Sequence, residues 1–102
     1  MTPTARSLRE LERRGYVADV VERRITSRLT KDLWGIADIL AVRGQEILAV
    51  QATSGSNVAA RVKKIESAEH VAAVRQANIR IVVWGWRKSA GGEWVLREVD
   101  VS

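Results

Sequence analysis

The sequence predicts an α/β protein with a mixed sheet, and three observations lead to that fold class. Segments with helical apolar periodicity alternate with segments typical of strands, in the order α-β-β-β-α-β-β. A short Gly-containing turn joins two of the predicted strands into a hairpin. Both faces of that hairpin carry apolar side chains, so we expect it in the middle of the sheet, with helices on both faces.

The first predicted element is a helix that begins after Thr2 and ends before Gly15. Thr2 is a candidate N-cap, Pro3 suits the first turn, and glycine is favoured just beyond a helix end. An apolar stripe should face the core, formed by Ala5, Leu8 and Leu11. A first strand over 16–25 follows, and residues 26–32 are a polar, basic connection.

The second and third strands cover 33–42 and 46–53, and a Gly/Ser turn at 54–57 leads to a helical region. Asn57 is the expected N-cap of that region, which spans 58–77 and has a break near Ser67, where a second helix could begin. The side chains expected to point inward are Val58, Val62, Ile65, Val71 and Val74. Two final strands are predicted over 79–86 and 93–101.

Composition excludes several classes of protein. The chain has 102 residues, which suits one domain over 1–102, and it has no apolar run of the roughly 18 residues that a membrane helix needs. It lacks cysteine and has one histidine, which excludes disulfides, zinc ribbons and thiol catalysis and leaves oxygen ligands for any metal. The net charge of +5 favours an anionic partner such as nucleic acid. We expect a cytoplasmic protein.

The hairpin turn determines which residues of strands two and three face each other. A two-residue Gly44-Gln45 loop of type II′ places Arg43 opposite Glu46 and, further along, Asp38 opposite Gln51. Because side chains alternate along a strand, Asp38, Gln51 and Thr53 should emerge on one face at one end of the hairpin.

This polar group has two interpretations. Asp38 and Gln51 could form a hydrogen-bonded cross-strand pair at a sheet end. However, burying a carboxylate costs several kcal/mol without a strong partner, and a divalent cation is such a partner.

The segments GIADILAV and ILAVQATS resemble the PD-(D/E)xK nuclease superfamily, in particular its small Holliday-junction-resolvase-like and phage-type members. The resemblance covers roughly 4–86 and implies a restriction-endonuclease-like core with the order α-β-β-β-α-β(-β). It also implies Mg²⁺- or Mn²⁺-dependent hydrolysis of phosphodiester bonds in DNA, including branched or structured DNA. Asp38 would be the main metal ligand, Gln51 a neutral ligand through its carbonyl oxygen, and Thr53 a group that positions water.

The chain departs from the superfamily pattern, because Gln51-Ala52-Thr53 stands where Glu-x-Lys is expected. The resemblance implies that a lysine could come from elsewhere, and the candidates are Lys31, Lys63 and Lys64. It also implies a further acid, for which Glu10, Glu12 and Glu22 are candidates.

Basic and polar residues flank the proposed site on both sides in sequence and should bind phosphates. They are Arg23, Arg24, Arg28, Lys31, Ser54, Asn57, Arg61, Lys63 and Lys64. Trp84, Trp86 and Trp94 are expected in core or interface packing rather than base stacking, and His70 is expected at the surface without a role.

The sequence therefore predicts a DNA nuclease, expected as a homodimer because one small chain would cover only part of a duplex or junction. Two alternatives stay open. One is a nucleic-acid-binding module of the same fold without catalysis, and the other is an oligomeric assembly protein whose tryptophans form the interface.

Overall fold

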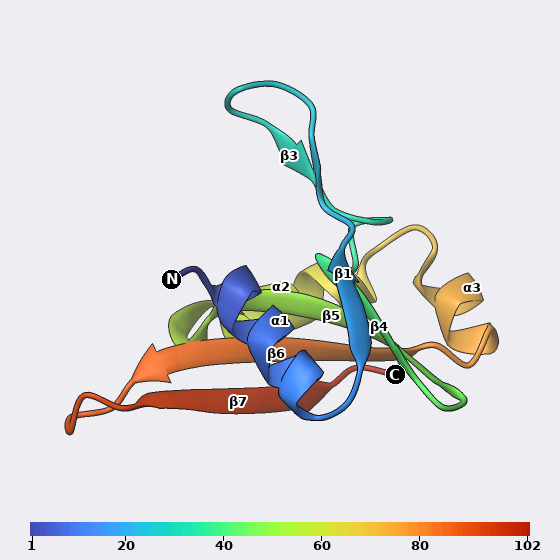
Figure 1. Ribbon diagram of the computed structural model, residues 1–102. Coiled ribbons are helices and arrows are strands. Elements are labelled where there is room, and N and C mark those ends of the chain that lie inside the picture. Colours follow the sequence, from blue (N-terminus) through green and yellow to red (C-terminus); the bar gives the residue numbers. More distant parts are fainter.

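The computed structural model describes residues 1–102, which are organised around a five-stranded sheet with the order β1-β4-β5-β6-β7 (Figure 1). The strands are β1 (Val17–Val20), β4 (Ile39–Arg43), β5 (Glu46–Ser54), β6 (Arg80–Lys88) and β7 (Trp94–Asp100). β5 and β6 are parallel, whereas the other neighbouring pairs are antiparallel. The mixed sheet predicted from the sequence is therefore confirmed.

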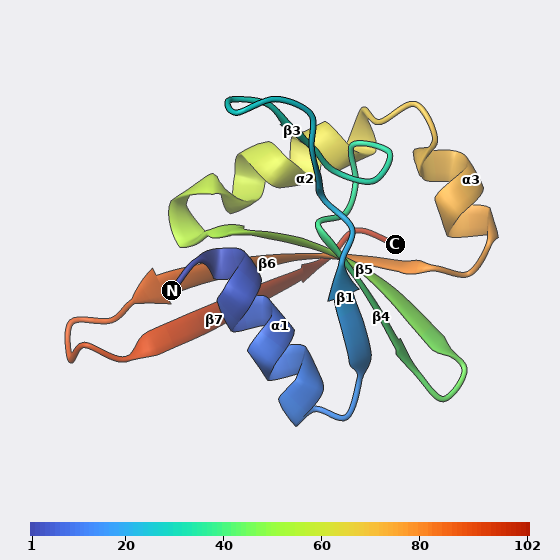
Figure 2. The same cartoon turned by 45° about the horizontal axis from the view of Figure 1, so that its top comes forward.

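Helices cover both faces of this sheet (Figure 2). α1 (Pro3–Arg13) lies on one face, and α2 (Val58–Glu66) and α3 (Val71–Gln76) lie on the other. Leu11 and Trp84 belong to the core under α1, and Ala49 and Ile65 belong to the core under α2 and α3. β5 is buried along most of its length, as expected for a strand between two helical layers. None of the helices is both long and apolar enough to cross a membrane.

α1 begins and ends as predicted, and of its predicted apolar stripe Leu11 is buried and Leu8 packs against the core. The Oγ1 atom of Thr2 accepts a hydrogen bond of 3.1 Å from the Ala5 backbone N–H, and Gly15 has a φ of +90°. Ala5 is exposed, so its predicted place in the core is wrong. A residue that was not predicted to be buried is Ser7, whose hydroxyl accepts a hydrogen bond of 2.9 Å from Trp86 Nε1.

The hairpin of β4 and β5 has the predicted register near its turn. Gly44 has a φ of +57° and Arg43 lies opposite Glu46, as a type II′ turn requires. Regular pairing stops at Ile39 opposite Val50, and the Asp38 N–H donates to the Val50 carbonyl at 2.8 Å. The predicted ladder position of Asp38 opposite Gln51 therefore lies just beyond the regular strand.

The second strand begins later than predicted, at Ile39 rather than Leu33. Residues before it form a tight turn in which Trp34 and Gly35 both have positive φ, at 57° and 69°. The bridge between Leu33 and Ala37 closes this turn. Two successive left-handed residues are incompatible with an extended strand, which is why alternation alone misplaced the boundary.

The first strand is also shorter than predicted, because the chain leaves the sheet after Val20. β2 (Arg23–Arg24) pairs with β3 (Thr30–Lys31) in a hairpin that projects from the body (Figure 1). We call residues 22–31 the arm; all of them are exposed. The arm has no alternating apolar face that could be buried, so it cannot continue as a sheet strand under a helix.

The helical region after β5 contains the predicted break, but its caps differ. A short 3₁₀ turn (Gly55–Asn57) precedes α2, and the Asn57 side chain donates to Ser54 Oγ at 3.1 Å instead of capping the helix. Ser67 ends α2 rather than starting the next helix, and α3 begins after His70.

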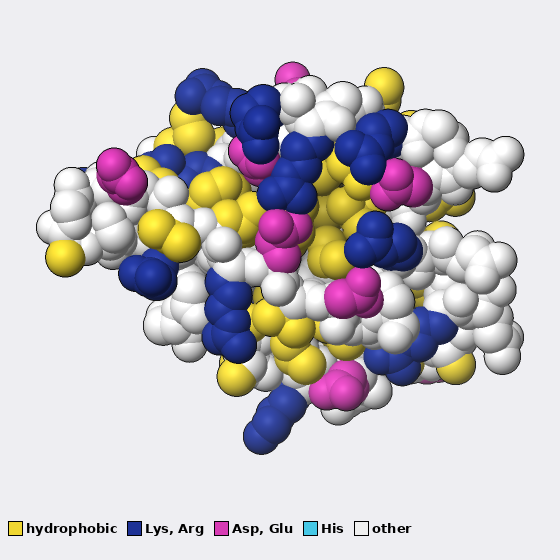
Figure 3. Space-filling view, turned by 90° about the horizontal axis from the view of Figure 1, so that it is seen from below, with side chains coloured by type: hydrophobic (Ala, Val, Ile, Leu, Met, Phe, Trp, Pro, Cys, Tyr) yellow, Lys and Arg dark blue, Asp and Glu magenta, His cyan; other side chains and the backbone are white.

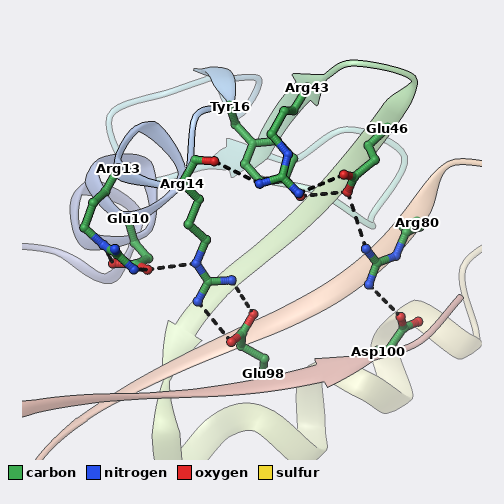
Figure 4. Close-up of polar contacts among 9 residues, drawn as sticks. All are labelled: Glu10, Arg13, Arg14, Tyr16, Arg43, Glu46, Arg80, Glu98 and Asp100. Carbon is green, nitrogen blue, oxygen red and sulfur yellow. Dashed lines mark hydrogen bonds and ion pairs between the residues drawn. The ribbon is translucent and has the colours of Figure 1, made fainter.

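The face beside α1 carries an ion-pair network that connects the helix to the sheet (Figure 4). Arg14 contacts both Glu10 and Glu98, at 2.8 and 2.9 Å. The remaining members are Arg13, Tyr16, Arg43, Glu46, Arg80 and Asp100.

On the underside of the molecule as drawn in Figure 1, acidic and basic side chains are interspersed rather than gathered in one basic patch (Figure 3). This face therefore lacks the concentrated positive charge that favours binding of an anion.

Candidate metal and nucleic-acid site

Asp38 is buried immediately before β4, with 6% of its surface exposed. Its Oδ2 atom accepts a hydrogen bond of 2.9 Å from the Ala52 backbone N–H. Its Oδ1 atom has no hydrogen-bond partner in the chain and is accessible to solvent. Asp38 therefore holds one oxygen in the sheet and presents the other to solvent.

The surroundings of Asp38 disfavour its ionised form. Burial raises the pKa of the Asp38 carboxyl most, and the charges of Glu22 and Asp32 raise it further. The Ala52 N–H and the Lys64 ammonium lower this pKa, but their effect is smaller and the net direction is upward. A carboxylate in this setting lacks a full counter-charge, and a bound cation would supply one.

Gln51 is fully buried in β5, and both ends of its amide are used within the chain. Its Nε2 atom donates to the Ile36 carbonyl at 2.8 Å and to Asp32 Oδ2 at 3.2 Å. Its Oε1 atom accepts a hydrogen bond of 2.8 Å from Arg61 of α2. The side chain thus connects the sheet, the turn before β4 and α2.

Asp32 is a member of this site that the sequence analysis missed. Its Oδ2 atom also lies 2.5 Å from Lys64 Nζ, so it links Gln51 to α2. The sequence does carry a sign of it: Asp32 is an acid in an otherwise basic connection and stands directly before LWGIAD. No side-chain hydrogen bond joins Asp38 to Gln51. Asp32 and Lys64 contact each other, and the charges of both act on Asp38.

Thr53 is buried on β5, two residues beyond Gln51, and its hydroxyl makes no side-chain hydrogen bond within the chain. Because alternate residues share a face of a strand, Thr53 and Gln51 lie on the same face. The position is compatible with a small polar group beside the site, but it supplies no positive charge.

The three candidate acids occupy different places. Glu10 is bound by Arg13 and Arg14, whose hydrogen bonds lower its pKa to about 2. Glu12 is exposed on α1 and forms no ion pair. Glu22 lies at the base of the arm and is the candidate whose charge acts on Asp38.

The basic residues fall into three groups. Arg23, Arg24, Arg28 and Lys31 belong to the arm, and Arg23 and Lys31 line a cavity together with Asp32. Arg61 and Lys64 turn toward Gln51 and Asp32, whereas Lys63 is exposed on α2. Ser54 and Asn57 contact each other at the C-terminal end of β5 and have no hydrogen bond to Asp38 or Gln51. Among the three candidate lysines, Lys64 is the one whose charge acts on Asp38.

No group of three His, Asp or Glu side chains is arranged to hold a metal ion. Mg²⁺, however, is commonly held by one or two carboxylates together with water and substrate phosphates. The open oxygen of Asp38 and the neighbouring charge of Glu22 fit that kind of shared site. The protein alone should therefore bind a divalent cation weakly.

Comparisons with known proteins agree with this architecture. No family model matches the chain, and no curated protein sequence is significantly similar to it. A solved structure of Hjc, a Holliday junction resolvase from Archaeoglobus fulgidus, superimposes with a TM-score of 0.54 at 19% identity. The match covers 97% of this chain and 70% of the resolvase chain. The protein therefore has the restriction-endonuclease-like α/β fold that its sequence predicts.

Proposed function

We propose that the protein is a DNA nuclease of the PD-(D/E)xK type that uses Mg²⁺ or Mn²⁺ and acts at Asp38. The observation that carries this proposal is the state of Asp38: a desolvated carboxylate with an open oxygen, further disfavoured by Glu22 and Asp32. Buried acids that lie near one another are unfavourable unless a cation offsets their charges. The resolvase-like fold supports the same reaction class by analogy.

Asp38 and Glu22 would hold the ion, with DNA phosphates completing its ligands. When bound, the ion would supply an acidic centre that activates water and offsets charge on the phosphodiester. The Ala52 N–H fixes the Asp38 carboxylate in one orientation by binding Oδ2, which keeps Oδ1 available. The expectation that the Gln51 carbonyl oxygen also binds the ion stays a prediction, because this oxygen already accepts a hydrogen bond from Arg61.

Lys64 is the proposed replacement for the absent motif lysine. It comes from α2 rather than from β5, and Asp32 holds its ammonium group at 2.5 Å. A cation fixed in this way would stabilise negative charge that develops on a phosphate at the site. Thr53 is assigned the smaller role of a polar neighbour that positions water.

DNA would be held mainly through its phosphates by the four basic residues of the arm and by Lys63, with Ser54 and Asn57 as hydrogen-bonding groups. Such contacts are independent of sequence and weaken with salt. We also propose a homodimer, because the chain measures only 41 × 35 × 25 Å along its principal axes. Light scattering at micromolar concentration tests this point, and a monomer bound to DNA would contradict it.

A second function is favoured by the Gln51–Arg61 hydrogen bond. This contact places a guanidinium on the residue that replaces the motif glutamate. A DNA-binding module without catalysis would need such charge and no metal. It predicts salt-dependent binding to DNA that chelator does not change, and no cleavage with any divalent ion.

The test of the nuclease is cleavage of plasmid and of branched DNA with Mn²⁺, by wild type and Asp38→Asn. The asparagine keeps an oxygen that can accept the Ala52 N–H, so the fold should be retained. Glu12→Gln removes the same charge from an exposed position and serves as the control. We expect cleavage by wild type and the control and at least a hundredfold loss in Asp38→Asn. Equal cleavage by all three would mean that Asp38 is not the site.

A further inference from the structure

The turn before β4 holds Trp34 in an unusual state. The Ile36 N–H donates to the Leu33 carbonyl at 2.9 Å, and both central residues have positive φ, so Leu33–Ile36 is a turn of type I′. Asn and Gly are favoured at the first central position, and a bulky residue there is strained. Trp34 nevertheless occupies it and leaves 48% of its surface exposed. Strained residues of this kind are concentrated at binding sites.

Trp34 stands between two cavities that adjoin each other. The first has a volume of about 260 Å³ and is almost entirely apolar; it is lined by Trp34, His70, Ala73, Val74, Ala77 and Ile79. The second is about 390 Å³, and most of the residues that line it are polar or charged; Trp34 and His70 belong to it as well. The apolar cavity and the cavity lined by charged residues thus meet at the indole ring of Trp34.

The second cavity has two basic residues without an acidic partner. Arg23 and Lys31 lie directly opposite each other in the pairing of β2 with β3, and neither forms an ion pair. Like charges that face each other across strands destabilise the pairing. Of the acids in this cavity, Asp32 is bound to Lys64, and Glu69 is largely exposed and lies 3.7 Å from His70. An anion between Arg23 and Lys31 would offset the repulsion.

We propose that this region is a subsite for one unpaired nucleotide, with the base stacked on Trp34 and its phosphate between Arg23 and Lys31. The inference rests on the proposed function, since Asp32 connects this cavity to the site at Asp38. Both faces of a base in an intact duplex are already stacked, so only a base that has left the stack can use the indole. The substrate class is therefore DNA with unpaired nucleotides at a branch, flap or end. A second copy of this chain, with its own net charge of +5, would bring like charge to the basic pair and is the less favourable occupant.

The test measures binding in EDTA, where cleavage cannot interfere. The probes are a fluorescein-labelled duplex and the same duplex with a five-nucleotide flap that carries 2-aminopurine. Trp34→Asn removes the ring and suits the left-handed turn, so the variant should fold. Trp34→Phe keeps a stacking surface, and Trp94→Ala removes a ring of similar exposure (44%) at the start of β7.

We expect Trp34→Asn to bind the flap DNA about tenfold more weakly and to leave duplex binding unchanged. Trp34→Phe should retain most of the affinity, and Trp94→Ala all of it. The 2-aminopurine fluorescence should be quenched by wild type and not by Trp34→Asn. Lys31→Gln should weaken binding of both DNAs and reduce the salt slope by about one.

Equal binding of flap and duplex by wild type, or equal loss in Trp34→Asn and Trp94→Ala, would overturn the subsite. A change of oligomeric state in Trp34→Asn, with DNA binding unaltered, would show that a second copy covers this face, and would also overturn it. The proposals for the subsite and for the nuclease can be refuted separately. Cleavage that requires Asp38 without preference for flaps refutes only the subsite, whereas Trp34-dependent binding without any cleavage refutes only the nuclease.

Discussion

Replacing Gln51 with glutamate restores the motif residue, yet we expect it to destabilise the protein. The Gln51 Nε2 atom donates two hydrogen bonds, to Ile36 O and to Asp32 Oδ2, and a glutamate oxygen at that position would face two acceptors instead. Leaving buried polar groups unsatisfied costs about 1–3 kcal/mol each, while the Arg61 contact would recover part of this as an ion pair. The net loss should be about 3 kcal/mol at neutral pH, which lowers Tm by at least about 10 °C in a domain of this size.

The stability of Gln51→Glu should depend on pH, and the direction follows from the pKa of the new carboxyl. Burial and the nearby Asp32 would raise the pKa of the new carboxyl in the folded state above its unfolded value. The variant should therefore approach wild type in stability as pH falls, and lose stability as pH rises through the folded pKa. A protonated glutamate also regains one donor for the Ile36 carbonyl.

Thermal unfolding by circular dichroism in EDTA, at pH 5 and pH 8, measures this prediction. Thr53→Val is the matched control, because Thr53 is buried on the same face of β5 and its side chain makes no hydrogen bond. We expect the control to lose less than about 1 kcal/mol of folding stability. A Gln51→Glu protein as stable as wild type at pH 8 would refute the assignment of Gln51 as a structural connection.

Three further changes test other parts of the structure. Asp38→Asn should raise Tm in EDTA at pH 8, because burial and neighbouring acids disfavour the charged form, and the gain should vanish toward pH 4; a lower Tm at pH 8 would contradict this. Gly85→Ala should cost about 2–3 kcal/mol in denaturant unfolding, because its Cβ would lie 2.3 Å from Val58 Cγ2; Val58→Ala in the same chain should recover much of that loss, and strictly additive losses would refute the contact. Glu10→Gln should remove about 1 kcal/mol above pH 5, after allowance for solvent screening, and progressively less as pH falls toward 2, since the hydrogen bonds of Arg13 and Arg14 lower the pKa of Glu10 to about 2; a loss of the same size at pH 6 and at pH 2 would contradict the ion pair.

Local sequence rules were sufficient where one short-range interaction decides the structure. The Gly44 turn determined the β4–β5 register, and the first helix was delimited by Thr2 and Gly15. The mixed sheet was predicted from the order of helices and strands, and the structure shows its parallel pair to be β5 and β6, which a helical crossover joins.

The regions that the sequence did not predict depend on longer-range interactions or on strained backbone. Alternation suggested an extended strand from Leu33, but a Trp34-Gly35 turn of type I′ is an unusual choice that no propensity favours. Asp32 joined the site only because the chain folds back before β4 and brings it to Gln51 and Lys64. Ser7 was missed because its burial depends on a partner in β6, Trp86, which lies far away in sequence.

Cleavage of branched DNA with Mn²⁺ by wild type and Asp38→Asn, purified side by side with Glu12→Gln, tests the central claim most directly. We expect products from wild type and Glu12→Gln, and none from Asp38→Asn at the same protein concentration. Intact DNA in all three reactions, with binding that EDTA leaves unchanged, would contradict the nuclease and favour the DNA-binding module.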